Sequence, residues 1–100
     1  MRTTIVHCKK EPYDIYIGRP SKWGNYFREG VDGSREEIIE KYQEWILSNE
    51  ELLNDIPELV GKVLGCWCEN KPCHGAVLVK LADRFQEKFP EIEEQGNLFE

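Results

Sequence analysis

A chain of 100 residues is long enough for one small domain and too short for two. Its formal net charge of −6 argues against a protein whose main partner is duplex DNA, because such domains usually carry a basic face. The sequence contains no run of about twenty apolar residues of the kind that spans a membrane, so we expect a cytoplasmic protein without a membrane partner.

Two short strands and a loop are expected in the first third of the chain. Residues 3–8 are rich in β-branched side chains, and residues 13–18 alternate apolar with other side chains. Residues 18–27 lack a helical period and are interrupted by Gly, Pro and Asn, which is typical of a loop. A long ordered loop in a small domain is more often functional than accidental, so we treat this loop as a candidate binding element.

A capping box predicts the first helix. Ser34 is the expected N-cap and Glu37 the residue three positions later, and apolar side chains then recur at helical spacing. We expect these apolar side chains to be core residues: Ile38, Tyr42, Trp45 and Ile46. A second, shorter helix should begin near Asn49 and break near Pro57.

The last third of the chain predicts a strand, a tight loop and a helix. Residues 63–68 form a short apolar run, and an amphipathic pattern continues from about Gly75 to Phe89, just before Pro90. Residues 1–90 therefore predict a single α/β domain, with a short and mainly parallel sheet and helices packed against it, similar to half of a Rossmann fold. Residues 91–100 are expected to be an acidic tail. A core of this size also makes homo-oligomerisation a reasonable way to bury more surface.

Residues 66–75 hold three of the four cysteines and one of the two histidines. They join a strand to a helix, where ligands bind in open α/β sheets. One hypothesis is a zinc-stabilised interaction module, because four ligand-type residues match the number that tetrahedral zinc needs. These residues are Cys66, Cys68, Cys73 and His74. The spacing differs from usual structural zinc sites, and we take a metal-free site as the leading hypothesis.

An anion or nucleotide site is the hypothesis we favour for this junction. Cys73, His74 and Gly75 precede or begin the final helix, where unpaired N–H groups and the helix dipole favour phosphate. Trp23 or Trp67 could stack on a base.

The loop supplies the opposite wall of the expected pocket. Arg19 and Lys22 are candidates for holding phosphate charge, and Ser21 and Asn25 for polar edges of the ligand. Cys66 would line the junction side.

Thiol chemistry is a third hypothesis. A helix N-terminus lowers the pKa of a cysteine, so Cys73 could act as a nucleophile with His74 beside it, in a thiol-dependent enzyme acting on nucleotides. The cysteines could equally be small buried hydrophobic residues and His74 a helix cap. Whether the protein is an enzyme stays open at this point.

Three motifs in order resemble the bacterial and phage family called domain of unknown function 4326. They are residues 15–25 (IYIGRPSKWGN), the Asp32-Gly33 turn with its following helix, and residues 65–75 with Gly-Cys-Trp-Cys and Cys-His-Gly. Tyr26 departs from the family, which usually has Pro after Trp-Gly-Asn. The resemblance implies an α/β site at these motifs. Its occurrence in phages leads us to expect sequestration of a nucleotide signal, in the bacterial host cytoplasm, beside nucleotide processing.

Overall fold

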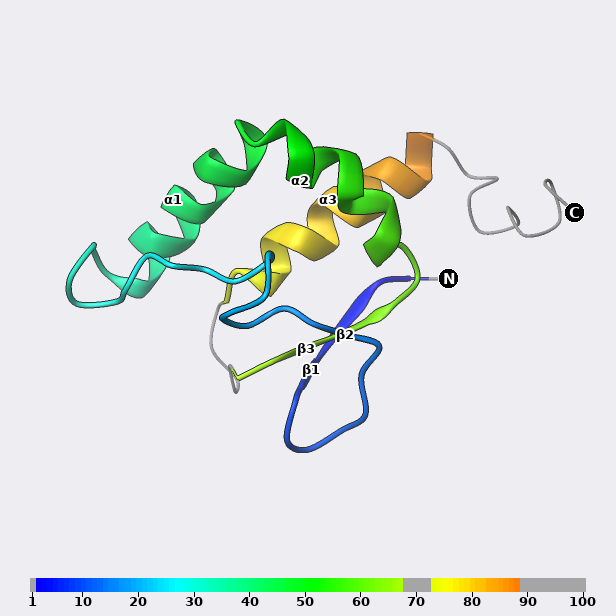
Figure 1. The fold of residues 1–100 in the computed structure, drawn as a ribbon, viewed down its shortest axis with the longest axis horizontal. Coiled ribbons are helices and arrows are strands. Elements are labelled where there is room, and N and C mark those ends of the chain that lie inside the picture. Colours follow the sequence, from blue (N-terminus) through cyan, green and yellow to red (C-terminus); the bar gives the residue numbers. More distant parts are fainter. Residues whose placement is uncertain (1, 68–72, 89–100) are drawn as a thin grey trace, which may run out of the picture.

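A computed structural model describes residues 2–67 and 73–88 as a small α/β domain (Figure 1). Its three strands are β1 (Thr4–His7), β2 (Ile15–Tyr16) and β3 (Val63–Cys66). All pair in parallel, in the order β1-β3-β2, which confirms the expected fold class. The strand that comes last in the chain thus lies in the middle of the sheet.

The central strand β3 is the best-buried strand, because it pairs on both edges. Thr4 lies opposite Val63 on one side, and Ile15 lies opposite Leu64 on the other. Leu64 is fully buried, as expected for a parallel strand covered by other elements. Gly65 has no side chain, and the ring of Tyr13 packs onto the space where a Cβ would be.

The helices follow the signals in the sequence closely. Ser34 and Glu37 form the capping box of α1 (Arg35–Leu47), and the Asn49 side chain caps α2 (Glu50–Asp55). Pro57 then lies in the 3₁₀ helix η1 (Ile56–Leu59), because its ring cannot continue an α-helix. The last described helix is α3 (Gly75–Lys88).

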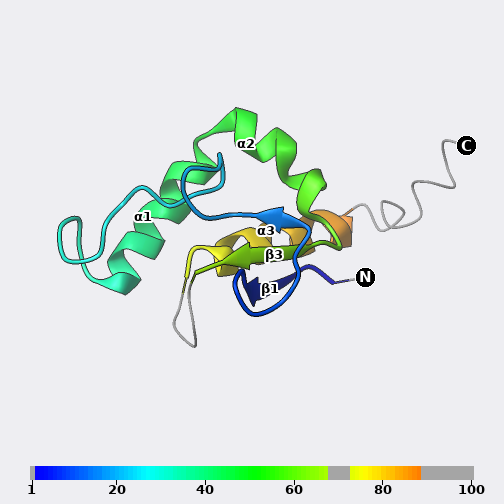
Figure 2. The same ribbon diagram turned by 60° about the horizontal axis from the view of Figure 1, so that its bottom comes forward.

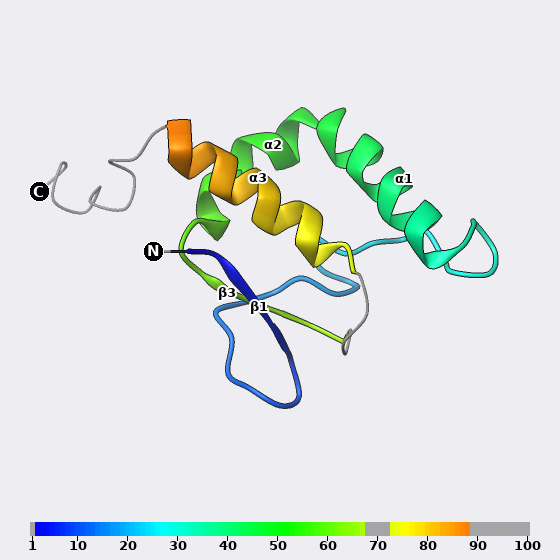
Figure 3. The ribbon, with the colours of Figure 1, turned by 180° about the vertical axis from the view of Figure 1, so that it is seen from behind.

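The helices gather around one core with the sheet. Figure 2 shows α3 running behind β3, and Figure 3 brings α3 to the front with α1 and α2 beside it. Fully buried side chains from every layer meet there, including Ile17 after β2, Tyr42 and Ile46 of α1, Leu64 of β3 and Leu78 of α3. Trp45 packs against this core from its half-buried position on α1, as expected.

Two expectations fall outside the described residues. The acidic tail at residues 91–100 is one, and the strand position of Cys68 is the other. None of the described helices is long and apolar enough to cross a membrane.

Candidate functional site

A pocket of about 490 Å³ lies where the carboxyl ends of β2 and β3 meet the start of α3. Arg19 and Asn25 line it from the loop after β2. The opposite side is lined by four residues of the strand-helix junction: Cys66, Trp67, Cys73 and His74. The structure therefore brings together the two segments that the sequence placed on opposite walls. A volume of this size is within the usual range for small-molecule sites.

Trp67 is the most exposed of the aromatic side chains that line the pocket, which also include Phe27. It is 56% exposed, and its Nε1–H donates to the Tyr16 hydroxyl oxygen at 2.7 Å. The Tyr16 hydroxyl in turn donates to the Arg19 carbonyl oxygen at 3.1 Å. This chain of hydrogen bonds joins the end of β3 to the loop after β2. It holds the two walls of the pocket in register.

His74 ties the start of α3 to the end of β2. Its Nε2 lies 2.7 Å from the Ile17 carbonyl oxygen, and because a carbonyl can only accept, this nitrogen carries the proton. The ring is 8% exposed and meets the ring of Tyr42 edge-on at 5.0 Å. His74 therefore helps to fix the start of α3 against the segment after β2, and it also lines the pocket.

Asn25 shapes the loop through both ends of its amide. Its Nδ2 donates to the Ile38 carbonyl oxygen at 3.3 Å, and its Oδ1 accepts from the Phe27 N–H at 3.0 Å. The loop is thereby fastened to α1. Asn25 lines the pocket, and both its amide nitrogen and its amide oxygen are hydrogen-bonded within the chain.

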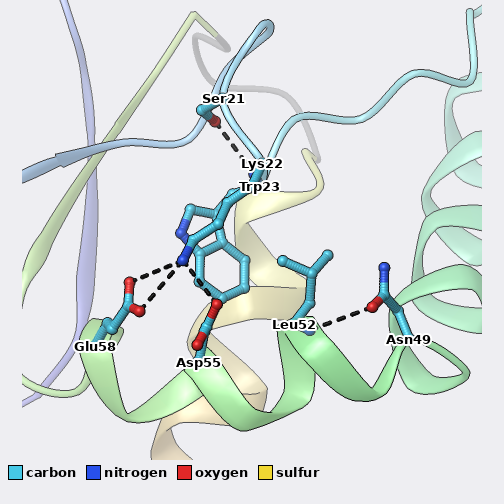
Figure 4. A network of polar contacts seen from close by, with 7 residues as sticks. All are labelled: Ser21, Lys22, Trp23, Asn49, Leu52, Asp55 and Glu58. Carbon is cyan, nitrogen blue, oxygen red and sulfur yellow. Dashed lines mark hydrogen bonds and ion pairs between the residues drawn. The ribbon is translucent and has the colours of Figure 1, made fainter.

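Lys22 does not face the pocket, which corrects the phosphate-binding role expected for it. Its Nζ donates to Asp55 Oδ2 at 2.8 Å and to the Glu58 carboxylate at 3.2 Å (Figure 4). The hydrogen bond to Asp55 is the main reason that the pKa of Lys22 is raised above 10.5. Lys22 thus fastens the loop to α2 and η1.

Trp23 does not offer a stacking face, which corrects the second expectation for this loop. It is 2% exposed and belongs to the core, with its carbonyl oxygen accepting from the Tyr42 hydroxyl at 2.7 Å. Ser21 also serves the loop itself, because its hydroxyl oxygen accepts from the Trp23 N–H at 3.3 Å (Figure 4). Neither Ser21 nor Trp23 lines the pocket.

The N–H of Gly75 is engaged within the chain. That N–H donates to Cys73 Sγ at 3.2 Å. A Cβ at Gly75 would lie 2.9 Å from Ile5 and 3.0 Å from Ile17, so the glycine serves close helix–sheet packing. The backbone anion site expected from Cys73 to Gly75 stays a prediction, with the N–H of Gly75 already engaged by Cys73.

Positive charge in the pocket comes instead from arginines, two of which the sequence analysis left out of the site. Arg28 and Arg35 join Arg19 on the lining, together with Glu29. Arg35 lies 3.2 Å from the Glu29 carboxylate. Three arginines against one glutamate give the lining a formal charge of +2. Their positions in the sequence could have indicated a place in the site. Arg28 directly follows the candidate binding loop, and Arg35 directly follows the capping residue Ser34.

Two of these arginines are available to a ligand. Across residues 2–67 and 73–88, no hydrogen bond or ion pair engages the side chain of Arg19 or Arg28. Both residues are exposed. Their guanidinium groups can therefore turn toward an anion without breaking a contact of the folded chain.

The zinc hypothesis stays a prediction. Among the described residues, no group of three or more His, Cys, Asp or Glu side chains is placed to hold a metal ion. Cys68, one of the four ligands that this hypothesis needs, lies outside them. The sulfur atoms of Cys66 and Cys73 are 3.5 Å apart.

Comparison with known proteins identifies the family. Residues 3–84 match the family described as "Domain of unknown function (DUF4326)". The chain belongs to this family. Of the ten site residues predicted from the sequence, the six that line the pocket all lie within the matched part of this DUF4326 chain.

The relatives of this DUF4326 chain include viral proteins. One is "Uncharacterized protein R718" of Acanthamoeba polyphaga mimivirus, 43% identical over an alignment of 86 residues, and the match covers 68% of this chain and 65% of the relative. Another is the "Uncharacterized 12.4 kDa protein in nrdA-td intergenic region" of Enterobacteria phage T4, 36% identical over an alignment of 90 residues, and the match covers 85% of this chain and 82% of the relative. No solved structure matches the chain.

Proposed function

We propose that this DUF4326 domain binds a nucleotide, or another phosphate-bearing nucleotide derivative, in the pocket between the two walls. One observation carries the proposal: arginine side chains and an exposed tryptophan line the same pocket of about 490 Å³. Its position outside the carboxyl ends of parallel strands is the usual ligand position in open α/β sheets.

The arginines suit the phosphate part of such a ligand. A guanidinium group matches phosphate oxygens in geometry and can donate two parallel hydrogen bonds. Arg19 and Arg28 are exposed and unengaged, and the lining as a whole carries +2. An acidic protein can bind an anion in this way, because only the pocket needs a positive potential.

Trp67 suits the base. Stacking of a base on an aromatic ring contributes about 1–3 kcal/mol and tolerates different bases. The indole is held at its Nε1 by Tyr16, so little side-chain freedom is lost when a ligand stacks on it. Phosphate and base are thus recognised from opposite walls.

Ligand binding is tested by thermal shift. The panel contains nucleoside mono-, di- and triphosphates, dinucleotides and inorganic phosphate. At least one nucleotide is expected to raise the unfolding midpoint in a concentration-dependent way. Absence of any shift across the panel at high concentration would reject the proposal.

The arginine contribution is tested on the nucleotide that gives the largest shift. Each of Arg19→Gln and Arg28→Gln is expected to weaken binding roughly tenfold or more, because a hydrogen bond to a charged group contributes about 1.5–3 kcal/mol. Arg84→Gln is the matched control, since Arg84 is an exposed arginine of α3 that lines no part of this pocket. Equal affinities for all four proteins, measured by calorimetry, would contradict the assignment.

Sequestration and turnover are separated by the fate of the ligand. A binding protein returns the nucleotide unchanged after denaturation, and mass spectrometry of the released small molecules shows this directly. A thiol-dependent enzyme returns a product instead, and Cys73→Ser abolishes its formation. We favour sequestration, because the described pocket residues include one carboxylate, that of Glu29, and not a pair, and because the Nε2 of His74 is engaged by the Ile17 carbonyl oxygen.

A further inference from the structure

Two cysteines form a buried pair on the pocket wall. Cys66 is the last residue of β3 and is 1% exposed, and Cys73 precedes α3 and is 7% exposed. Their sulfur atoms lie 3.5 Å apart, and both residues line the pocket. The pair is therefore largely shielded from bulk solvent, and the pocket that both residues line is the route by which we expect a small oxidant to approach it.

Two features beside Cys73 would stabilise a thiolate there, while its burial at 7% exposure opposes the charge. Gly75 donates its N–H to Cys73 Sγ at 3.2 Å, and the sulfur lies at the N-terminus of the 14-residue helix α3. Both the N–H group and the helix dipole stabilise an anion at this position. Thiolates, not thiols, react with oxidants and disulfides.

We propose that Cys66 and Cys73 are a reversible oxidation site, which closes to an intramolecular disulfide between β3 and α3. A disulfide needs the sulfur atoms at about 2.05 Å. The pair must therefore close by roughly 1.5 Å, which is the difference between 3.5 Å and that bond length. We expect rotation of the two side chains, with a small movement of the Cys73 backbone, to bring the sulfur atoms together.

The oxidant is a hydroperoxide, and hydrogen peroxide is the simplest. The Cys73 thiolate attacks one peroxide oxygen and becomes a sulfenic acid, while the other oxygen leaves as hydroxide and is protonated to water. The Cys66 sulfur then attacks the Cys73 sulfur, the S–S bond forms, and the sulfenic oxygen leaves as a second water. Overall, two thiols and one peroxide give one disulfide and two waters. A dithiol reductant reverses the change.

Oxidation acts on the pocket, because both sulfurs are part of its wall. The new bond draws the start of α3 toward the end of β3, and the Gly75 N–H loses its thiolate acceptor. We expect the oxidised and reduced proteins to differ in the shape of this wall. The oxidation site itself does not depend on which ligand the pocket takes.

The experiment uses the wild-type chain and needs no substitution. The folded protein is titrated with hydrogen peroxide, remaining thiols are alkylated, and the linkage is mapped by peptide mass spectrometry. Two of the four cysteines are expected to lose reactivity together, with a linkage between Cys66 and Cys73 that dithiothreitol reverses. Circular dichroism confirms that the chain stays folded during the titration.

Three results would overturn the proposal. These are a linkage that involves Cys8 or Cys68 in place of either partner, a disulfide between two chains, and oxidation of Cys73 to the sulfinic acid without any disulfide. Variants sharpen the test. Cys8→Ser is expected to leave the linkage unchanged, and Cys66→Ser is expected to leave a Cys73 sulfenic acid that dimedone traps. Failure of dimedone to label the folded Cys66→Ser protein contradicts the order of attack.

Discussion

Tyr42 connects three parts of the molecule through one side chain. Its hydroxyl donates to the Trp23 carbonyl oxygen at 2.7 Å, and its ring contacts His74 edge-on. Burial is the main reason that the pKa of Tyr42 is raised above its ordinary value of 10.0, and negative charge on nearby Cys73 raises it further. The helix α1, the loop after β2 and the start of α3 therefore depend on a neutral phenol.

Removing the Tyr42 hydroxyl should destabilise the fold. Tyr42→Phe leaves the buried Trp23 carbonyl without this donor, which costs about 1–3 kcal/mol in free energy of unfolding. Urea denaturation measures the change. Tyr13→Phe is the control, because Tyr13 is 43% exposed and packs on Gly65 through its ring. A loss no larger than that of the control would show that the buried hydrogen bond contributes little.

The raised pKa of Tyr42 also predicts how stability changes with pH. The folded state favours the neutral phenol, so this contribution is fully present below pH 10.0, the ordinary tyrosine value, and is lost as the pH rises toward the higher folded value. Wild-type protein should therefore lose stability above pH 10 more steeply than Tyr42→Phe does. Denaturation midpoints measured from pH 8 to pH 11 test this. Parallel curves for the two proteins would speak against it.

At the scale of single residues, the sequence indicated which segments form the pocket better than which side chains face it. Trp23 and Lys22 carry suitable chemistry, yet one lies in the core and the other pairs with Asp55. A loop without a helical or strand period has no pattern that tells inward from outward positions. Their orientations depend on contacts with α1 and α2, far along the chain.

At the scale of elements, the helices were the most predictable part. Ser34 with Glu37, and Asn49 at the next cap, marked two helix starts that the structure confirms. These signals are local, because cap and first turn are adjacent in the chain. Strand β2 is shorter than expected at two residues, with the Asp14 and Ile17 N–H groups continuing its hydrogen bonds to β3.

The strand order could not be read from the sequence in the same way. Placing β3 between β1 and β2 depends on pairings such as Thr4 with Val63, which are distant in the chain. Local propensity describes each strand and leaves its neighbours open. The pocket could not be read from local sequence for the same reason. Arg19 and Cys66 line one pocket because β2 and β3 are neighbours in the sheet.

The capping box gives a prediction at this scale. Ser34→Ala removes the side chain that accepts from the Glu37 N–H and should lower the free energy of unfolding by about 1 kcal/mol. Glu40→Ala on the exposed face of the same helix is the control, with an expected change within about 0.5 kcal/mol. Chemical denaturation compares the two. A smaller effect for Ser34→Ala than for Glu40→Ala would contradict the role of the cap.

At the scale of the whole molecule, the charge distribution favours binding of small anions over binding of polyanions. The chain carries −6 overall, while the pocket lining carries +2. We expect a single nucleotide bound in the pocket to meet mainly this local positive charge. A duplex extends beyond the pocket and meets the acidic remainder of the surface.

Duplex DNA of mixed sequence is therefore expected not to bind. Fluorescence anisotropy of a labelled duplex at physiological salt should stay constant as the protein is added. The same preparation is checked with the nucleotide that gives the largest thermal shift, so that an inactive sample is recognised. Salt-sensitive binding of the duplex would contradict this prediction.

The three tryptophans differ in exposure, so the intrinsic tryptophan fluorescence of the protein can report on the pocket. Trp23 is shielded in the core, Trp45 is half-buried against it, and Trp67 stands 56% exposed on the pocket wall. Collisional quenchers such as iodide should therefore act mainly on the emission of Trp67. An occupant of the pocket changes this emission directly, so occupancy can be followed in real time without a label.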